Sequence, residues 1–166
     1  MYELAQVNIA RLLAPLDDPL LADFVANLEP VNALADRADG FVWRLQDGAD
    51  ATGIRVFDDD WLIVNLSVWR SPAALLRFIY DDGHRAVLRR RREWFAKLDI
   101  PVTALWWVPA GHRPTVAEAE ERLIELRLHG PGPRAFGLRS ILPAPDGTGA
   151  GPVDDLRARR PAECDA

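Results

Sequence analysis

The spacing of apolar residues divides the chain into alternating strands and helices. Segments with a period of two predict strands, since every second side chain of a strand shares a face. These segments are residues 4–9, 41–45, 62–69 and 102–108, with shorter strands also expected at 54–57 and 135–142. Three-and-four spacing predicts a helix after Asp18-Pro19, a second after Ser71-Pro72 and a third from Thr115 to Gly130.

Local signals predict where these helices begin, break and end. Pro30 should kink or divide the first helix, because proline removes a backbone donor. Residues 81–83, Asp-Asp-Gly, should interrupt the second helix before it resumes and runs to Pro101. Thr115 and Glu118 form a capping-box pattern at the start of the third.

The strand over residues 62–69 has two different sides. One side is wholly apolar and predicts a dry core. The other combines large side chains with hydrogen-bonding groups, Ile63, Asn65, Ser67 and Trp69. Such a mixed side is typical of a lined cavity.

The order strand, helix, strand, strand, helix, strand predicts a ferredoxin-like α+β fold, a split βαβ with an antiparallel sheet. Two helices would cover one face of that sheet. Large apolar residues on both sides, with Trp106 and Trp107 on opposite faces, predict that a second copy of the chain covers the other. We expect one domain over residues 1–142 and a disordered tail over 143–166, where Pro, Gly, Asp and Arg accumulate.

Composition narrows the functional classes. The net charge of −5 gives no general electrostatic support for a nucleic-acid partner. The single cysteine, Cys164, excludes an internal disulfide, and no apolar run approaches the length of a membrane span. We therefore expect a cytoplasmic protein that contacts neither nucleic acid nor membrane. Three dispersed histidines predict no metal site, and the common phosphate-loop, dinucleotide and serine-hydrolase motifs do not occur.

Several short motifs resemble those of one family, domain of unknown function 3291, within the dimeric α+β barrel superfamily that includes antibiotic-biosynthesis monooxygenases. The similarity covers roughly residues 3–142. The motifs are Leu4-Ala5-Gln6-Val7-Asn8, Val68-Trp69-Arg70-Ser71, Tyr80 with His84, Glu93-Trp94-Phe95, Leu105-Trp106-Trp107-Val108-Pro109, Gly111-His112-Arg113-Pro114 and Gly130-Pro131. The resemblance implies a dimeric α+β barrel, and the family label carries no settled activity.

In the wider superfamily the ligand cavity lies between the sheet and its helices, which implies a homodimer with a small hydrophobic or aromatic ligand in each subunit. The candidate substrate-binding residues are Gln6, Asn8, Asn32, Ser67, Trp69, Phe78 and Trp107. Amides and hydroxyls among aromatic rings suit a flat, partly polar molecule. The alternative is that these polar groups satisfy one another or buried waters.

His84, Asn65 and Tyr80 are the candidate catalytic residues. Imidazole titrates near neutrality and can act as a base, although a core histidine bonded to a carbonyl would show the same pattern. The resemblance implies cofactor-independent oxygenation, in which a base deprotonates an aromatic polyketide and the carbanion reacts with oxygen. His84 would be the base, Asn65 or Asn8 would stabilise the oxyanion, and Tyr80 would bond a phenolate or enolate oxygen.

Two alternatives remain open. Relatives that degrade haem carry Asn on the first strand, matched by Asn8, and then Trp and His on the second helix. Here Phe78 stands in the Trp position and Leu88 in the His position, which argues against haem, although His84 lies about one turn away. The second alternative is a non-catalytic dimer that binds a small ligand in the same cavity. We expect no tightly bound cofactor.

Overall fold

The computed structural model describes residues 1–46 and 54–147. Four antiparallel strands form one sheet in the order β2-β3-β1-β4. The strands are β1 (Tyr2–Arg11), β2 (Phe41–Arg44), β3 (Leu62–Trp69) and β4 (Thr103–Pro109). The expected α+β fold with a ferredoxin-like antiparallel sheet is confirmed.

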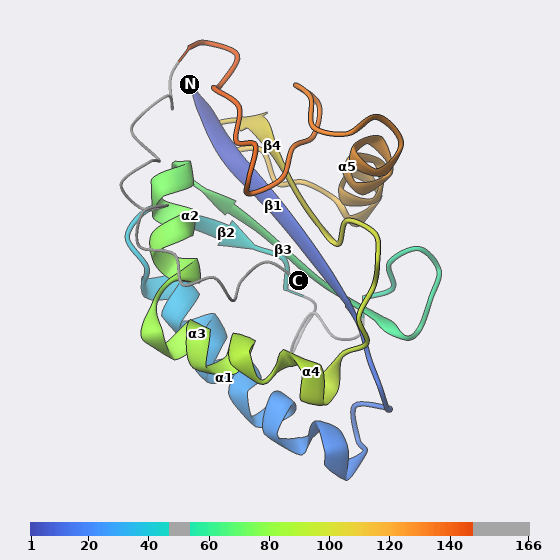
Figure 1. Ribbon diagram of the computed structural model, residues 1–166. Coiled ribbons are helices and arrows are strands. Elements are labelled where there is room, and N and C mark those ends of the chain that lie inside the picture. Colours follow the sequence, from blue (N-terminus) through green and yellow to red (C-terminus); the bar gives the residue numbers. More distant parts are fainter. Residues whose placement is uncertain (47–53, 148–166) are drawn as a thin grey trace.

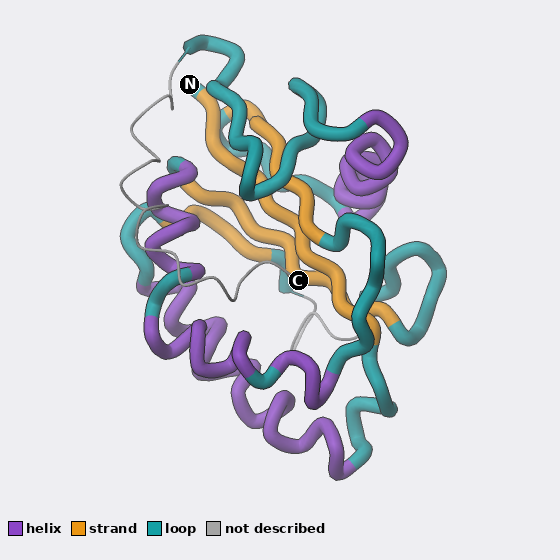
Figure 2. Tube along the Cα trace, viewed as in Figure 1, coloured by secondary structure: helices purple, strands orange, loops and turns teal. Residues whose placement is uncertain are grey.

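Helices lie on both faces of this sheet (Figures 1 and 2). On one side are η1 (Pro19–Leu21), α1 (Ala22–Arg37), α2 (Pro72–Ile79), α3 (Asp82–Arg89) and α4 (Arg91–Trp94). The other side carries α5 (Val116–His129). We call the first side the helix-rich face and the second the α5 face.

The α5 face is a dry core made by the apolar side of each long strand. Its buried residues include Val7 of β1, Leu66 of β3 and Trp106 of β4, which pack with Leu123 of α5 and with Val56. The prediction that this face lacks a cover within the chain was wrong. The predicted fold has two helices, both on the other face. In the structure α5 and Val56 supply the cover that we expected from a second copy of the chain.

The helix starts agree with their predicted caps. The Asp18 carboxylate accepts from the Leu20 amide at 2.8 Å, and the Ser71 hydroxyl accepts from the Ala74 amide at 3.2 Å. The Thr115 hydroxyl accepts from the Glu118 amide at 3.2 Å at the start of α5. Each cap satisfies a donor that the first helical turn leaves without a partner.

Two helix predictions need correction. Pro30 lies inside α1 without dividing it. The second helical region ends at Trp94 rather than at Pro101. The chain turns there because the Ala96 amide donates to the Arg11 carbonyl at 2.9 Å and Phe95 forms a bridge with Leu12, so long-range pairing replaces the helical hydrogen bonds.

The short strands expected at 54–57 and 135–142 reduce to isolated bridges in the described residues, Val56 with Asp59 and Phe136 with Leu105. Trp106 and Trp107 face opposite sides of the sheet, as predicted. Of the predicted tail, residues 143–147 are described, and Ala144 is buried. Residues 148–166 lie outside the described part of the chain.

Candidate functional site

Two apolar clusters fill the two ends of the layer between the sheet and the helix-rich side. The Trp69 cluster contains Leu4, Ala35, Trp69, Ala74, Leu75, Leu105 and Phe136, with Phe41, Phe78, Ile79 and Trp107 packed against it. The Trp94 cluster contains Leu12, Ala14, Leu21, Phe24 and Trp94, with Leu28, Ile63 and Val87 packed against it.

The sheet residues between these clusters are polar. On β1, Leu4 belongs to one cluster and Leu12 to the other, and Gln6 and Asn8 lie between them on the same strand face. On β3, Asn65 and Ser67 lie between Ile63 and Trp69 in the same way. The strand register places Gln6 beside Ser67 and Asn8 beside both Asn65 and Thr103.

The helices repeat this order above the sheet. On α1, Asn32 is four residues after Leu28 of the Trp94 cluster and three before Ala35 of the Trp69 cluster. Residues at these spacings share a helical face. On α3, His84 is three residues before Val87 of the Trp94 cluster, and its ring contacts Phe78 of the Trp69 cluster.

The sheet and the helices therefore each carry polar residues between the two apolar clusters, and we call these residues together the polar belt. The belt consists of Gln6, Asn8, Asn32, Asn65, Ser67, His84 and Thr103. Six of these seven are predicted site residues, drawn from four separate elements.

Hydrogen bonds within the sheet satisfy part of the belt. The Trp69 indole N–H donates to the Ser67 hydroxyl at 3.0 Å, and that hydroxyl donates to Gln6 Oε1 at 2.9 Å. The Asn8 amide donates to the Thr103 hydroxyl at 2.7 Å. For Gln6 and Asn8 the structure thus agrees with the alternative that the polar groups satisfy one another.

Asn65 differs from its neighbours. It lies in a central strand on the helix-rich face, yet it is exposed. Its side chain forms no hydrogen bond with any described residue. A central strand position becomes exposed where the covering helices leave a gap, so the Asn65 amide is free to bind an incoming molecule.

An aromatic stack forms one wall of the belt. Trp69 is 1% exposed, and its ring stacks on Phe78 with centroids 5.1 Å apart and an interplanar angle of 26°. The Phe41 ring packs edge-to-face with the Trp69 indole, with centroids 5.3 Å apart and an interplanar angle of 78°. Phe78 in turn contacts the His84 ring at 4.6 Å. Rings packed in this way hold one another in fixed orientations.

The His84 imidazole is held in one tautomer. Its Nδ1 lies 3.1 Å from the Ile79 carbonyl oxygen, which can only accept, so Nδ1 carries the proton and donates. Burial lowers the pKa of His84, and this effect exceeds the opposing effects of the Ile79 carbonyl and of Asp81. The ring is therefore neutral at neutral pH, with its lone pair on Nε2.

Nε2 is available for chemistry. It forms no hydrogen bond with a described residue, and it is not one of the buried unpartnered atoms of that part of the chain, which are both on arginines. The Nε2 lone pair is therefore without a hydrogen-bond partner in the part of the chain that the structure describes. An imidazole with a fixed Nδ1–H and an open Nε2 is arranged as a general base.

Tyr80 and Trp107 are the two remaining predicted site residues. Tyr80 is half-buried and ends α2, where its backbone N–H caps the helix. Trp107 packs against the Trp69 cluster, and its indole N–H donates to the Leu142 carbonyl at 2.8 Å. The polar group of Trp107 is therefore already bonded within the chain.

Sequence reasoning missed Thr103, Asp36 and Arg44. Plain alternation along β2 would place Arg44 on the α5 face, but the register shifts between Phe41 and Trp43. Such a bulge adds one residue and reverses the side on which the following residues lie. No local sequence signal indicates this shift.

The described residues contain no group of three or more His, Cys, Asp or Glu side chains that could hold a metal ion. None of the helices in that part of the chain is long and apolar enough to cross a membrane.

Comparison with known proteins places the chain in a family. A family model described as a domain of unknown function, DUF3291, matches residues 3–150. The chain belongs to this family. No curated protein matches.

Similar solved structures include SnoaB from Streptomyces nogalater, described as a cofactor-independent oxygenase. It is 19% identical, with 68% of this chain and 97% of SnoaB covered and a TM-score of 0.46. PA3566 from Pseudomonas aeruginosa is 15% identical, with 65% and 93% covered and a TM-score of 0.44. A Nitrosomonas europaea protein of unknown function is 17% identical, with 69% and 97% covered and a TM-score of 0.45.

Proposed function

We propose that the protein is a small-molecule enzyme, a cofactor-independent oxygenase or isomerase that acts on an aromatic, polyketide-type substrate of secondary metabolism. The state of His84 carries this proposal. Its Nδ1–H is held by the Ile79 carbonyl, its pKa is lowered by burial, and its Nε2 forms no hydrogen bond with a described residue. The description of SnoaB states the oxygenase class for that protein.

The proposed reaction begins with proton transfer from an activated ring carbon of the substrate to His84 Nε2. The resulting carbanion, delocalised onto the substrate oxygen as an enolate, accepts a hydrogen bond from the exposed Asn65 amide. Tyr80 is the second proposed donor to that oxygen.

Molecular oxygen then takes an electron from the enolate, and the two radicals combine to form a C–O bond. The peroxide takes the proton back from His84, and loss of water leaves a carbonyl where the carbon held two hydrogens. One oxygen atom enters the product and the other leaves as water. Without oxygen, return of the proton to another carbon gives isomerisation.

The substrate class follows from the walls of the belt. Half-buried Phe78 offers flat apolar surface, while half-buried Gln6, Asn8 and Asn32 provide hydrogen-bonding groups on the sheet and on α1. Trp107 extends the apolar wall beyond Leu4. A planar, fused-ring phenol or quinol fits this combination of flat apolar walls and a few orienting polar groups.

Oxygen uptake with a panel of anthrones and quinols tests the proposal. His84→Gln should lower the rate by about 10²- to 10⁴-fold, as expected for loss of a general base, and should leave ligand affinity in place. Asn65→Ala should lower it by about 10²-fold. His129→Gln, which changes an exposed histidine at the end of α5, is the matched control and should keep the full rate.

Two outcomes would contradict the proposal. One is a wild-type protein that neither consumes oxygen nor rearranges any member of the panel. The other is His84→Gln turning over at the wild-type rate. Ligand binding without turnover in both proteins would instead favour the non-catalytic ligand-binding alternative.

We also propose that the protein is a homodimer in the cytoplasm. The lone Cys164 supports a reducing compartment. Because α5 with Val56 covers the sheet on its own side, the contact is proposed to include the outer surface of α5, where Ile124 and Leu128 are exposed one turn apart. Sedimentation equilibrium should give twice the chain mass, and Leu128→Glu should shift it towards the monomer.

A further inference from the structure

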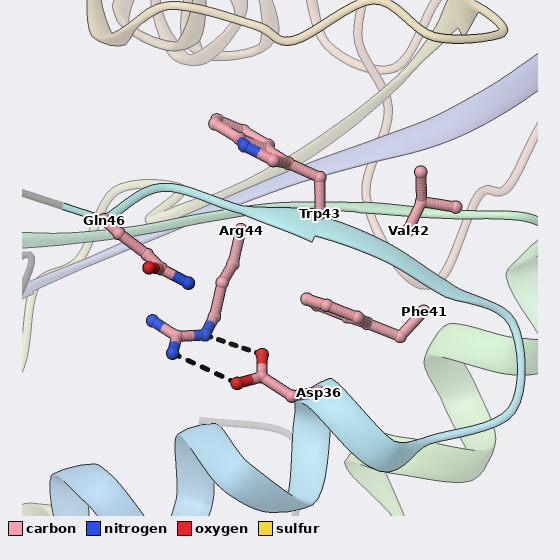
Figure 3. Close-up of a pocket in the computed structure, with 6 residues that line it drawn as sticks. All are labelled: Asp36, Phe41, Val42, Trp43, Arg44 and Gln46. Carbon is pink, nitrogen blue, oxygen red and sulfur yellow. Dashed lines mark hydrogen bonds and ion pairs between the residues drawn. The ribbon is translucent and has the colours of Figure 1, made fainter.

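A pocket of about 460 Å³ lies at the free edge of the sheet, beside β2. It is lined by Asp36, Phe41, Val42, Trp43, Arg44 and Gln46. Figure 3 shows that Phe41 and Arg44 project from β2 towards α1, whereas Val42 and Trp43 project to the opposite side. The bulge between Phe41 and Trp43 produces this arrangement.

The pocket adjoins the polar belt through two elements. Arg44 is the register partner of Ser67, so their side chains are cross-strand neighbours on the helix-rich face. Asp36 follows Asn32 by one turn of α1, so both lie on one side of that helix. The pocket is therefore the β2 side of the layer that holds His84 and Asn65.

Asp36 holds one edge of the Arg44 guanidinium. Arg44 Nε donates to Oδ1 at 2.8 Å, and Nη2 donates to Oδ2 at 3.2 Å. The third nitrogen, Nη1, forms no hydrogen bond with a described residue, and in Figure 3 it points away from the Asp36 carboxylate. The end of the fork, Nη1 with the second N–H of Nη2, therefore remains open to an acceptor.

We propose that Arg44 determines specificity by binding a carboxylate on the aromatic substrate through this open end, with Phe41 against the rings. The proposal rests on the function proposed above and adds an acidic group to the substrate. A guanidinium can bind two carboxylates on different edges, and its planar fork fits each of them in bidentate fashion. Asp36 acts as a positioning residue that fixes the plane of the fork.

The charges are compatible with this assignment. The substrate carboxylate would contact the guanidinium directly, while Asp36 lies across the guanidinium from it. Because Coulomb energy falls with distance, attraction to Arg44 exceeds repulsion from Asp36. An uncharged amide of the same shape should bind Arg44 less tightly than a carboxylate, since hydrogen bonds between two charged groups are the stronger ones.

The test compares the binding of an anthracene carboxylate with that of the matching anthracene carboxamide, measured by fluorescence titration. The wild type should prefer the carboxylate by about ten- to a hundredfold, as expected for a charge-assisted bidentate pair. Arg44→Gln should abolish this preference, and Arg44→Lys should keep only part of it because lysine lacks the fork.

Arg77→Gln is the control, since Arg77 forms a similar exposed pair with Asp39 at 3.1 Å outside the pocket. It should keep the wild-type preference. Circular dichroism confirms that each variant is folded, and Arg44→Lys provides a second variant if Arg44→Gln does not fold.

An equal preference in wild type and Arg44→Lys, or no binding of either probe, would overturn the assignment. Binding of these probes requires no turnover, so the result is independent of the His84 experiment. If the oxygenase proposal fails, a measured preference for the carboxylate still supports the role of Arg44. If the preference is absent, the oxygenase proposal can still be correct.

Discussion

Replacing Ser67 by alanine should destabilise the protein by about 2 kcal/mol, although it removes one oxygen atom. Ser67 is 5% exposed, and its hydroxyl accepts from the buried Trp69 indole N–H while donating to Gln6. A buried N–H that loses its acceptor costs about 1–3 kcal/mol. Gln6 is half-buried and can bond to water instead, so its loss adds little.

Urea unfolding followed by tryptophan fluorescence measures this loss. With a slope of about 1–3 kcal/mol per molar urea, the midpoint should fall by on the order of 1 M. Ser140→Ala is the matched control, because Ser140 is exposed in a turn and its backbone amide, which the substitution keeps, donates to the Gly137 carbonyl at 3.0 Å. The control should remain within about 0.5 kcal/mol of the wild type.

A double-mutant cycle assigns the effect to the indole. In a Trp69→Phe background the N–H is absent, so Ser67→Ala should cost about 1 kcal/mol less than in the wild type. The reasoning is refuted if Ser67→Ala costs the same in both backgrounds, or if it costs less than about 0.5 kcal/mol in the wild type.

Three further predictions concern His84, Gly40 and haem. Burial lowers the pKa of His84 below 6.5 in the folded protein, so the unfolded chain binds the proton more readily. The contribution of neutral His84 to the free energy of unfolding is therefore fully present above pH 6.5, and it falls as the pH drops from there through the folded-state pKa. His84→Gln should flatten that part of a plot of urea midpoint against pH, and superimposable plots would count against it. Gly40 has φ +82°, and an added Cβ would lie 2.5 Å from Ala74 Cβ. Backbone strain alone costs about 1–3 kcal/mol of stability, and the clash adds to it, so Gly40→Ala should destabilise the protein by more than this amount. Gly111→Ala, at φ +87° with no atom within 4 Å, should show the strain alone, and equal melting temperatures for the two variants would exclude the clash. Titration with haem should give no Soret band of a histidine-ligated species, since the resemblance to haem-degrading relatives puts Leu88 where their histidine is expected. A band that disappears in His84→Gln would show the opposite.

Much of the belt was predictable because a strand alternates its side chains locally. The period of two in β3 is enough to place Asn65, Ser67 and Trp69 on one side and the apolar residues on the other. The caps at Asp18, Ser71 and Thr115 were also readable, since capping involves donors only two or three residues away. The expectation that a second copy of the chain covers the other face failed at α5, because periodicity shows that a helix has an apolar side but not which sheet face it covers.

The sequence by itself determined which residues share a face within each strand and helix, because those relations depend on backbone geometry over a few residues. Tertiary structure decided which faces meet. It bonded Asn8 to Thr103 across 95 positions of sequence, placed the His84 ring against Phe78, and left Asn65 uncovered. It also turned Arg44 towards the site through a bulge, because strand register is set by pairing with β3 and not by the four residues of β2.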